Sequence, residues 1–290
     1  MKRKITLLYT LLCLVWGTTW IVLKTSLVEG TPPIYGVGLR FLLAGAVLWI
    51  IFFLKHESLP MTKRAWYIYL QFAIFNFTIA YALTYWGTQY IYSSVASIIW
   101  AGFPLVVGAL AHFQLPDERL TLYRIISILL GTVGVVIIVS QGQHLGGERV
   151  FIGIPVVVLA VLSSAWPNVH LKKYHDEVNT IQLNAVSQTL AAIALLLLSL
   201  ILEPNQPMVW SPYNIFAIAY LAIPGSVVTW MIYVWLFSHL SMGQISYVAF
   251  FPPLIATIIG WIFLQEVLTL PAIFGSLLVI SGAVLINLKR

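Results

Sequence analysis

Charged side chains are scarce in this chain, so the few that could do chemistry stand out. Lys, Arg, Asp and Glu make up 8% of the 290 residues, and no acidic residue lies in the middle of an apolar segment. Glu118 and Glu266 each end a long apolar run, at an offset of 148 positions. Such a carboxylate is either a solvated helix-end charge that fixes local geometry, which we favour, or one of two paired gates or proton sites.

Two basic residues also lie at the ends of apolar segments. Arg40 begins one segment and Lys24 ends another. Long basic side chains in such places commonly extend to the lipid headgroups. The alternative is that Arg40 reaches inward and steers an anionic or carboxylate-bearing substrate. At the offset of 148 positions Arg40 matches Gln188, which carries no charge, so a site of this kind would be asymmetric.

Prolines interrupt two apolar segments at matching positions. Pro104 and Pro252 are separated by the same 148 positions, and Pro253 follows the second of them. A proline inside a helix removes a backbone hydrogen bond and tends to bend the helix. In a membrane the freed carbonyl must be satisfied by neighbouring groups or by water. We therefore expect these helices to bend around a cavity, with a merely tolerated kink as the alternative.

Polar and aromatic side chains within the apolar segments mark the candidate cavity. Tyr81 and Tyr85 are four residues apart and share one helix face. A membrane-interface belt is the alternative for any single Trp or Tyr. The predicted substrate-binding residues are Trp16, Thr19, Asn76, Tyr81, Tyr85, Ser97, Trp100, Trp166, Asn168, Thr229, Trp230, Tyr233, Ser246 and Tyr247. The residues assigned to gating or coupling are Arg40, Glu118, Glu266, Pro104 and Pro252.

The elements that position these residues follow from composition. Hydrophobic residues make up 60% of the chain and charged residues 8%. A soluble domain has about 25% charged residues, and a soluble fold of this size could not cover its surface with only 8%. A soluble enzyme, a nucleic-acid-binding protein and a disordered protein are thereby excluded. A helix needs about 20 apolar residues to cross a bilayer. Dividing the two longest runs gives ten spans, at about 5–23, 34–54, 66–86, 93–113, 124–141, 151–171, 180–202, 214–237, 243–264 and 270–288.

Basic residues predict the orientation of these spans. With the N-terminus inside, twelve of the 15 Lys and Arg residues fall in cytoplasmic segments. The other side receives Lys24, Arg40 and Arg149. Because cytoplasmic loops carry an excess of Lys and Arg, we expect both termini to be cytoplasmic.

The second half of the chain repeats the first at the offset of 148 positions. Phe103-Pro104 aligns with Phe251-Pro252, and Leu120-Thr121-Leu122 with Leu268-Thr269-Leu270. The predicted units are 1–142 and 149–290, and each holds five spans. An odd number of spans makes the second unit enter the membrane from the opposite side. Such inverted repeats are typical of secondary transporters, although duplicated bundles also form channels and intramembrane enzymes.

Several of these segments resemble the EamA family of ten-helix exporters in the drug/metabolite transporter superfamily. The resemblance covers nearly the whole chain and identifies the two units as EamA-type repeats. It implies that helices 1, 3, 4, 6, 8 and 9 surround a central cavity. Helices 5 and 10 then lie outside it, with their glycines either at a homodimer interface or in packing within one chain. The matching residues are 16–20, 40–41, 81–85, 104–118, Gly131, Gly134, Trp166, Pro252, Glu266 and Gly282.

Together these features predict an all-α membrane transporter that exports small metabolites, such as amino acids or related amphiphiles, by alternating access. An aromatic cavity without buried charge fits neutral, zwitterionic or partly apolar cargo. A drug exporter and an uncoupled facilitator or channel for small neutral solutes are the alternatives. The sequence has no His-Glu-x-x-His or Gly-x-Ser-x-Gly, so we expect no enzyme, cofactor or metal site. The expected partners are a small-molecule substrate and the lipid of a bacterial plasma membrane, without nucleic acid.

Overall fold

The structure of the protein is a computed structural model, which describes residues 2–60, 62–114, 122–140, 149–174, 177–237, 239–240, 247–266 and 268–288. Within these ranges all regular structure is helical. The first half contains α1 (Lys2–Val28), α2 (Pro33–Leu54), α3 (Lys63–Gln71), η1 (Phe72–Ile79), α4 (Ala80–Thr88), α5 (Ser93–Ala101), α6 (Phe103–Gln114) and α7 (Leu122–Ser140). The second half contains α8 (Val150–Lys173), α9 (Thr180–Leu202), α10 (Pro212–Ala222), η4 (Ile223–Val228), α11 (Thr229–Phe237), η5 (Tyr247–Phe250), α13 (Phe251–Leu264) and α14 (Leu270–Leu288).

The helical segments have the length and composition of membrane spans. Seven of those described are long and apolar enough to cross a bilayer, and three shorter ones are also apolar. The chain is therefore a multi-pass membrane protein, and the count of ten spans stays a prediction. The seven are Arg3–Val28, Pro33–Leu54, Lys63–Thr88, Ser93–Gln114, Val150–Leu171, Thr180–Leu202 and Pro212–Leu236.

Several helix starts are set by local side chains. Thr62 accepts a hydrogen bond from the Ala65 amide at the start of α3. At the start of α9, Asn179 and Gln182 exchange side-chain and backbone hydrogen bonds, which satisfies two amides that the helix itself cannot. Proline begins both α2 and α10, where its missing N–H costs nothing.

Three predicted spans are interrupted rather than continuous. π-helical turns separate α3 from α4 and α10 from α11, and α5 ends before Gly102, just ahead of Pro104. Pro104 and Pro252 are each the second residue of a helix, α6 and α13 respectively. A proline is tolerated in a first turn, so each proline lies beside a helix break instead of kinking a continuous helix.

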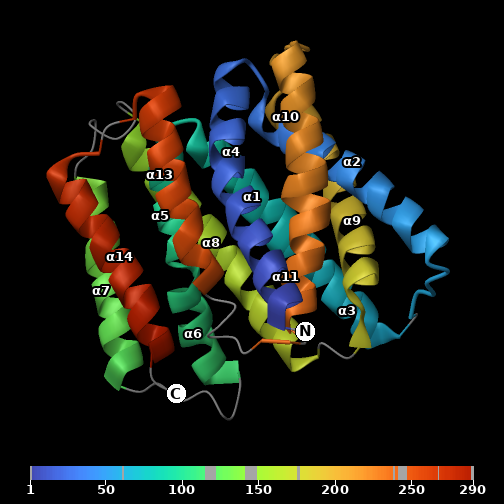
Figure 1. Cartoon of the computed structure of the whole chain (residues 1–290). Helices are drawn as coiled ribbons and strands as arrows, with labels where there is room; N and C mark the ends of the chain where they lie inside the picture. The colour runs from blue at the N-terminus through green and yellow to red at the C-terminus, as the bar shows by residue number, and fades with distance from the viewer. Residues whose placement is uncertain are drawn as a thin grey trace.

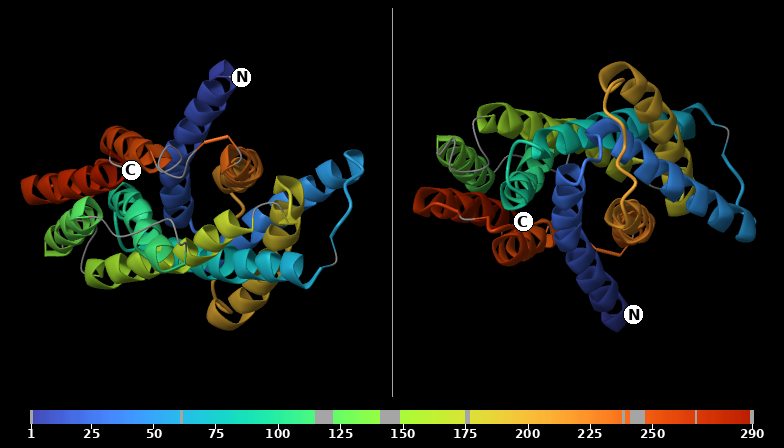
Figure 2. Two further views of the ribbon diagram at one scale, coloured as in Figure 1. Left: turned by 90° about the horizontal axis from the view of Figure 1, so that it is seen from below. Right: turned by 90° about the horizontal axis from the view of Figure 1, so that it is seen from above.

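Helices from the two halves of the chain pack against each other throughout the bundle. α2 packs on α9, α7 on α14, α4 on α8, and α1 on α13. In Figure 1, α7 and α14 lie side by side at one edge, and the beginning of α1 and the end of α14 lie at the same end of the bundle. The end-on views of Figure 2 show α2 at the edge away from α7 and α14. The largest core has the buried rings of Phe41, Tyr69, Phe72 and Phe77.

Glycines bring α7 and α14 into close contact within one chain. A Cβ on Gly134 would lie 2.5 Å from the Gly275 carbonyl oxygen, and one on Gly282 would lie 2.6 Å from the Ser127 carbonyl oxygen. Small residues of this kind let two membrane helices approach at the backbone. These two glycines are therefore used for packing inside the monomer.

Candidate substrate cavity

A cavity of about 140 Å³ lies between the helices of both halves. It is lined by α1, α2, α4, α5, α6, α8, α11, η5 and α13. Among the described residues, none from α7, α9, α10 or α14 lines it. The lining elements fall in predicted spans 1, 2, 3, 4, 6, 8 and 9. The resemblance places all of these around the cavity except span 2, which is α2. The predicted site residues that line it are Trp16, Thr19, Arg40, Tyr81, Tyr85, Ser97, Trp100, Pro104, Trp230, Tyr233 and Pro252.

Arg40 supplies the α2 part of the cavity wall. The residue is only 4% exposed, so it reaches inward and does not extend to the headgroups. Its Nε donates to Ser226 Oγ at 2.8 Å, its Nη1 to the Tyr85 hydroxyl at 3.2 Å, and its Nη2 to the Gly225 carbonyl at 2.9 Å. The expectation of a cavity without buried charge is therefore wrong. The sequence allowed Arg40 to lie either at the lipid headgroups or in the cavity. Ser226 and Gly225, which hold it at the cavity, lie far along the chain.

Two of the three partners of Arg40, Gly225 and Ser226, lie in the π-helical segment η4. A Cβ on Gly225 would lie 2.9 Å from Thr19 Cγ2, so the missing side chain lets Thr19 pack against this turn. The Gly225 carbonyl also accepts a hydrogen bond from Thr229 Oγ1 at 2.8 Å. π-Helical turns often occur at functional sites because they change the direction of backbone groups. Here the turn presents a carbonyl and a hydroxyl to one guanidinium.

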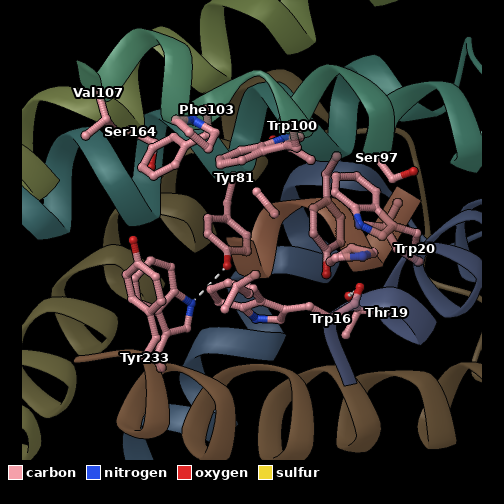
Figure 3. A pocket seen from close by; sticks show the side chains of 18 of the residues that line it. Trp16, Thr19, Trp20, Tyr81, Ser97, Trp100, Phe103, Val107, Ser164 and Tyr233 are labelled. Carbon is pink, nitrogen blue, oxygen red and sulfur yellow. Dashed lines mark hydrogen bonds between the residues drawn. The ribbon is translucent and has the colours of Figure 1, made fainter. Parts of the chain in front are cut away.

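Aromatic rings form a second part of the wall. The ring centroids of Trp16 and Tyr233 are 5.3 Å apart, those of Trp230 and Tyr233 are 5.3 Å apart, and Trp230 Nε1 donates to the Tyr81 hydroxyl at 3.0 Å. Figure 3 shows Trp16, Tyr81 and Tyr233 converging on the cavity from α1, α4 and α11. Rings held in this way offer faces and edges for an aromatic, aliphatic or cationic group.

A third part of the wall comes from the break between α5 and α6. Trp100 Nε1 donates to Thr84 Oγ1 at 3.2 Å, and the Trp100 ring stacks on Phe103 with centroids 6.0 Å apart. Pro104 follows directly in α6, and Pro252 lines the cavity from the first turn of α13. Both prolines therefore lie where a helix is interrupted beside the cavity.

Some predicted residues face neighbouring helices and not the cavity. Asn76 in η1 accepts hydrogen bonds from Ser164 Oγ at 2.5 Å and from Asn168 Nδ2 at 3.1 Å, which forms a buried polar contact with α8. The Trp166 ring lies 5.0 Å from that of Phe75. Thr229 is buried behind Arg40, on the shared Gly225 carbonyl. The spacing of residues in one helix indicates a common face but not which neighbour covers it.

The structure leaves three predicted residues without a side-chain description. Glu118 and Ser246 lie outside the described residues. Tyr247 begins η5, but its side chain is also outside the described part.

Glu266 is buried and is not a solvated charge. Its Oε1 accepts hydrogen bonds from the Ser93 amide at 2.7 Å and the Ser93 hydroxyl at 2.8 Å. Its Oε2 accepts from the Ser94 amide at 3.1 Å and the Ser94 hydroxyl at 2.6 Å. The carboxylate thus caps the N-terminus of α5, where the helix dipole favours a negative group. The favoured reading of a solvated charge is corrected, because Glu266 joins the end of α13 to a helix of the other half.

A second glutamate, which is not among the predicted site residues, makes the corresponding contact with α2. Glu203 lies directly after α9. Its Oε1 accepts a hydrogen bond from the Ile34 amide at 2.8 Å, and its Oε2 accepts one from the Tyr35 amide at 2.8 Å. Lys24 donates to the carbonyls of Thr88 and Gln89 at 2.9 and 3.1 Å, at the end of α4. Glu203 shares with Glu266 a place at the end of an apolar run, and this signal could have found it.

Other lining residues had weaker signals in the sequence. Trp20 is four residues from Trp16, and Thr84 lies between Tyr81 and Tyr85, so helical spacing could have found both. Small or apolar side chains gave no signal. The lining residues that were not predicted are Trp20, Leu23, Thr84, Phe103, Val107, Ser164, Val248 and Ala249.

Comparison with known proteins identifies the family. The EamA-like transporter family matches residues 3–140 and 151–288. The chain therefore belongs to the EamA-like transporter family, and its class is that of small-molecule transporters of the membrane.

Relatives and a solved structure agree with this assignment. The uncharacterized transporter YvbV of Bacillus subtilis is 29% identical over 99% of this chain and 93% of its own length. An uncharacterized transporter of Buchnera aphidicola subsp. Schizaphis graminum is 31% identical, with coverages of 88% and 84%. Protein PagO of Salmonella typhimurium is 29% identical, with coverages of 88% and 83%. A crystal structure matches with a TM-score of 0.69 at 18% identity, over 98% of this chain and 96% of that one, which shows the fold alone.

Proposed function

We propose that this protein is a secondary transporter that exports small metabolites, amino acids or related amphiphiles, across the plasma membrane by alternating access. The observation that supports this most is the cavity, because residues 1–142 and 149–290 both line it. Substrate sites of secondary transporters lie between the halves that move against each other. Aromatic rings and one buried cation give the cavity the mixed character that suits an amphiphilic cargo. The lining residues are assigned to cargo contact.

The proposed architecture is ten spans in two inverted five-helix repeats with both termini cytoplasmic. Two helix pairs support it: α2 packs on α9 and α7 packs on α14, which are equivalent helices under the 148-residue offset. The π-helical segments η1 and η4 also overlap under that offset. The beginning of α1 and the end of α14 lie at one end of the bundle (Figure 1). A homodimer through α7 and α14 is proposed to use their outer faces, since their inner faces contact each other.

In this orientation the two buried glutamates lie toward the outside of the cell. Glu266 ties the end of α13 to α5, and Glu203 ties the end of α9 to α2. Opening the cavity outward requires helices of one half to move away from helices of the other. We therefore assign Glu266 to the outer gate, and Glu118 to its counterpart on the cytoplasmic side.

Counterflow in proteoliposomes tests the proposed function. Vesicles holding the purified protein are preloaded with one amino acid or one cationic dye, and uptake of the labelled compound is followed. Saturable exchange of a subset of amino acids supports a metabolite carrier. Exchange of dyes alone identifies a drug exporter, and absence of exchange over the whole panel contradicts the proposed cargo class.

An imposed pH gradient separates a coupled carrier from a facilitator, since a facilitator equilibrates cargo but never concentrates it. Uphill accumulation in the unmodified protein that is lost in Glu266→Gln supports coupling through this residue.

A further inference from the structure

Arg40 carries a charge that no described acidic side chain neutralises. The ion pair found in the described part of the chain joins Arg64 to Glu177. Both side chains are partly exposed, and neither lines the cavity. The groups that Arg40 contacts are a serine hydroxyl, a tyrosine hydroxyl and a backbone carbonyl, all formally neutral. Two aromatic rings also attract the cation without neutralising its charge. The guanidinium carbon lies 5.0 Å from the Tyr81 ring centroid and 5.6 Å from that of Phe41.

The guanidinium also keeps hydrogen-bonding capacity. Arginine has five N–H groups, two on each terminal nitrogen and one on Nε. Three of them reach Ser226, Tyr85 and Gly225. One N–H on Nη1 and one on Nη2 therefore have no partner among the described residues. Two N–H groups on the two terminal nitrogens are what a carboxylate needs for a bidentate pair.

A buried and uncompensated cation in a membrane protein is costly and normally serves a function. Arg40 lines the cavity and is the charged residue among its described lining. A ligand in the cavity can therefore supply the missing anion. A single guanidinium balances one negative charge, which favours a carboxylate over a phosphate monoester with nearly two.

We propose that Arg40 is the anchor for a single carboxylate on the cargo, whose aromatic or apolar body lies among Trp16, Trp230 and Tyr233. This inference rests on the proposed function and narrows its cargo class to small monocarboxylates, amino acids included. The size of the cavity agrees with one small body, because an apolar cavity of about 150 Å³ accommodates a benzene ring and this one measures about 140 Å³.

The same contacts allow a purely structural role, in which Arg40 only fastens α2 to η4. The two roles differ in what they predict for ligand selectivity. A fastening residue affects stability and leaves the preference between an acid and its amide unchanged. An anchor determines that preference.

The test measures binding directly, with matched acid and amide pairs. The probes are L-phenylalanine against L-phenylalaninamide, and 3-phenylpropanoate against 3-phenylpropanamide. Purified protein in lipid nanodiscs is titrated, and binding is followed by the fluorescence of its tryptophans, of which Trp16, Trp20, Trp100 and Trp230 line the cavity. We expect at least one acid to bind about tenfold or more tightly than its amide, as when one charged hydrogen-bonded pair is made or lost.

Variants assign that preference to Arg40. Arg40→Gln is expected to remove the preference for the acid. Arg40→Lys keeps the charge without the fork of N–H groups, so it should retain a reduced preference. Arg64→Gln is the matched control, since the Arg64 side chain is 59% exposed and lies outside the cavity lining; it should behave as the unmodified protein.

The outcomes are separable from those of the transport assay. Equal binding of acid and amide by the unmodified protein overturns the inference, even where Arg40→Gln does not fold. Binding of no acid in the panel also overturns it, as does an unchanged preference in Arg40→Gln. Counterflow of an uncharged or cationic cargo with no acid preference leaves a transporter but removes the carboxylate anchor.

Discussion

The hydroxyl of Tyr85 accepts a hydrogen bond from Nη1 of Arg40 at 3.2 Å, and this contact joins α4 to α2 at the cavity wall. Tyr85 is the repeat mate of Tyr233, which has no arginine at the matching position, since Gln188 takes the place of Arg40. The two halves therefore present different chemistry to one cavity. In the first half Tyr85 contacts a guanidinium, whereas in the second half Tyr233 contacts the rings of Trp16 and Trp230.

Tyr85→Phe removes this acceptor while keeping the ring. A hydrogen bond to a charged group contributes about 1.5–3 kcal/mol, so the guanidinium loses part of its orientation. We expect the KM for a carboxylate cargo to rise about tenfold or more in counterflow, with normal yield of folded protein. Tyr67→Phe, on an exposed part of α3, is the control. An unchanged KM would contradict a role for the Tyr85 hydroxyl in holding Arg40.

Trp230→Phe shortens the aromatic wall. The change removes the N–H that donates to the Tyr81 hydroxyl and weakens the ring contacts with Trp16 and Tyr233. Each aromatic pair contributes about 0.5–1.5 kcal/mol, so we expect cargo affinity to fall about tenfold, measured by fluorescence titration. Trp210→Phe serves as the control because Trp210 is 59% exposed near a helix end. Equal effects of the two changes would exclude Trp230 as a cargo contact.

Glu266→Gln removes a charge that caps α5. One amide oxygen replaces two carboxylate oxygens, so two of the four donors of Ser93 and Ser94 lose their acceptor. A buried donor without a partner costs about 1–3 kcal/mol, and we expect a lower melting temperature in detergent, together with altered transport. Glu29→Gln, at an exposed site, should leave the melting temperature unchanged. If both proteins melted alike, the buried contact would contribute nothing to stability.

Gly260→Ala tests the same contact from the other side. The added Cβ would lie 2.5 Å from Glu266 Oε2 and 3.0 Å from Glu266 Cδ. The carboxylate must move away from Ser93 and Ser94, so we expect a loss of stability close to that of Glu266→Gln. The double variant should then melt little lower than either single one, because both changes break one interaction. Additive losses would show that Gly260 acts elsewhere, and Ile262→Ala on the exposed face is the control.

The helical architecture could be predicted because apolar runs of membrane length leave few other structures for the chain. The interruptions within the helices were harder to predict from the sequence. Proline marked the break near Pro104, but nothing in Phe72–Ile79 distinguishes a π-helix from an ordinary one before its neighbours are known. Among site residues, the presence of an aromatic side chain within a span placed Trp16, Tyr81 and Tyr85 at the cavity. It misplaced Trp166, since an aromatic residue within a span packs equally well on a neighbouring helix.

Arg40 shows why the rest of the site could not be deduced from the sequence. Its position near a helix start fits both a headgroup contact and a cavity contact. The choice is made by Gly225 and Ser226, which lie 185 and 186 residues further along the chain. Contacts of that separation have no local pattern in one sequence, although their chemistry is plain once the helices are assembled.

The contact of Glu203 with α2 has a consequence for how this protein can change by mutation. Glu203 accepts hydrogen bonds from the backbone N–H groups of Ile34 and Tyr35. Every amino acid except proline has such a group. Ordinary substitutions at positions 34 and 35 therefore leave the donors in place. The tie between these two parts of the molecule depends on a single replaceable side chain, and nearly all of its mutational sensitivity is concentrated in Glu203.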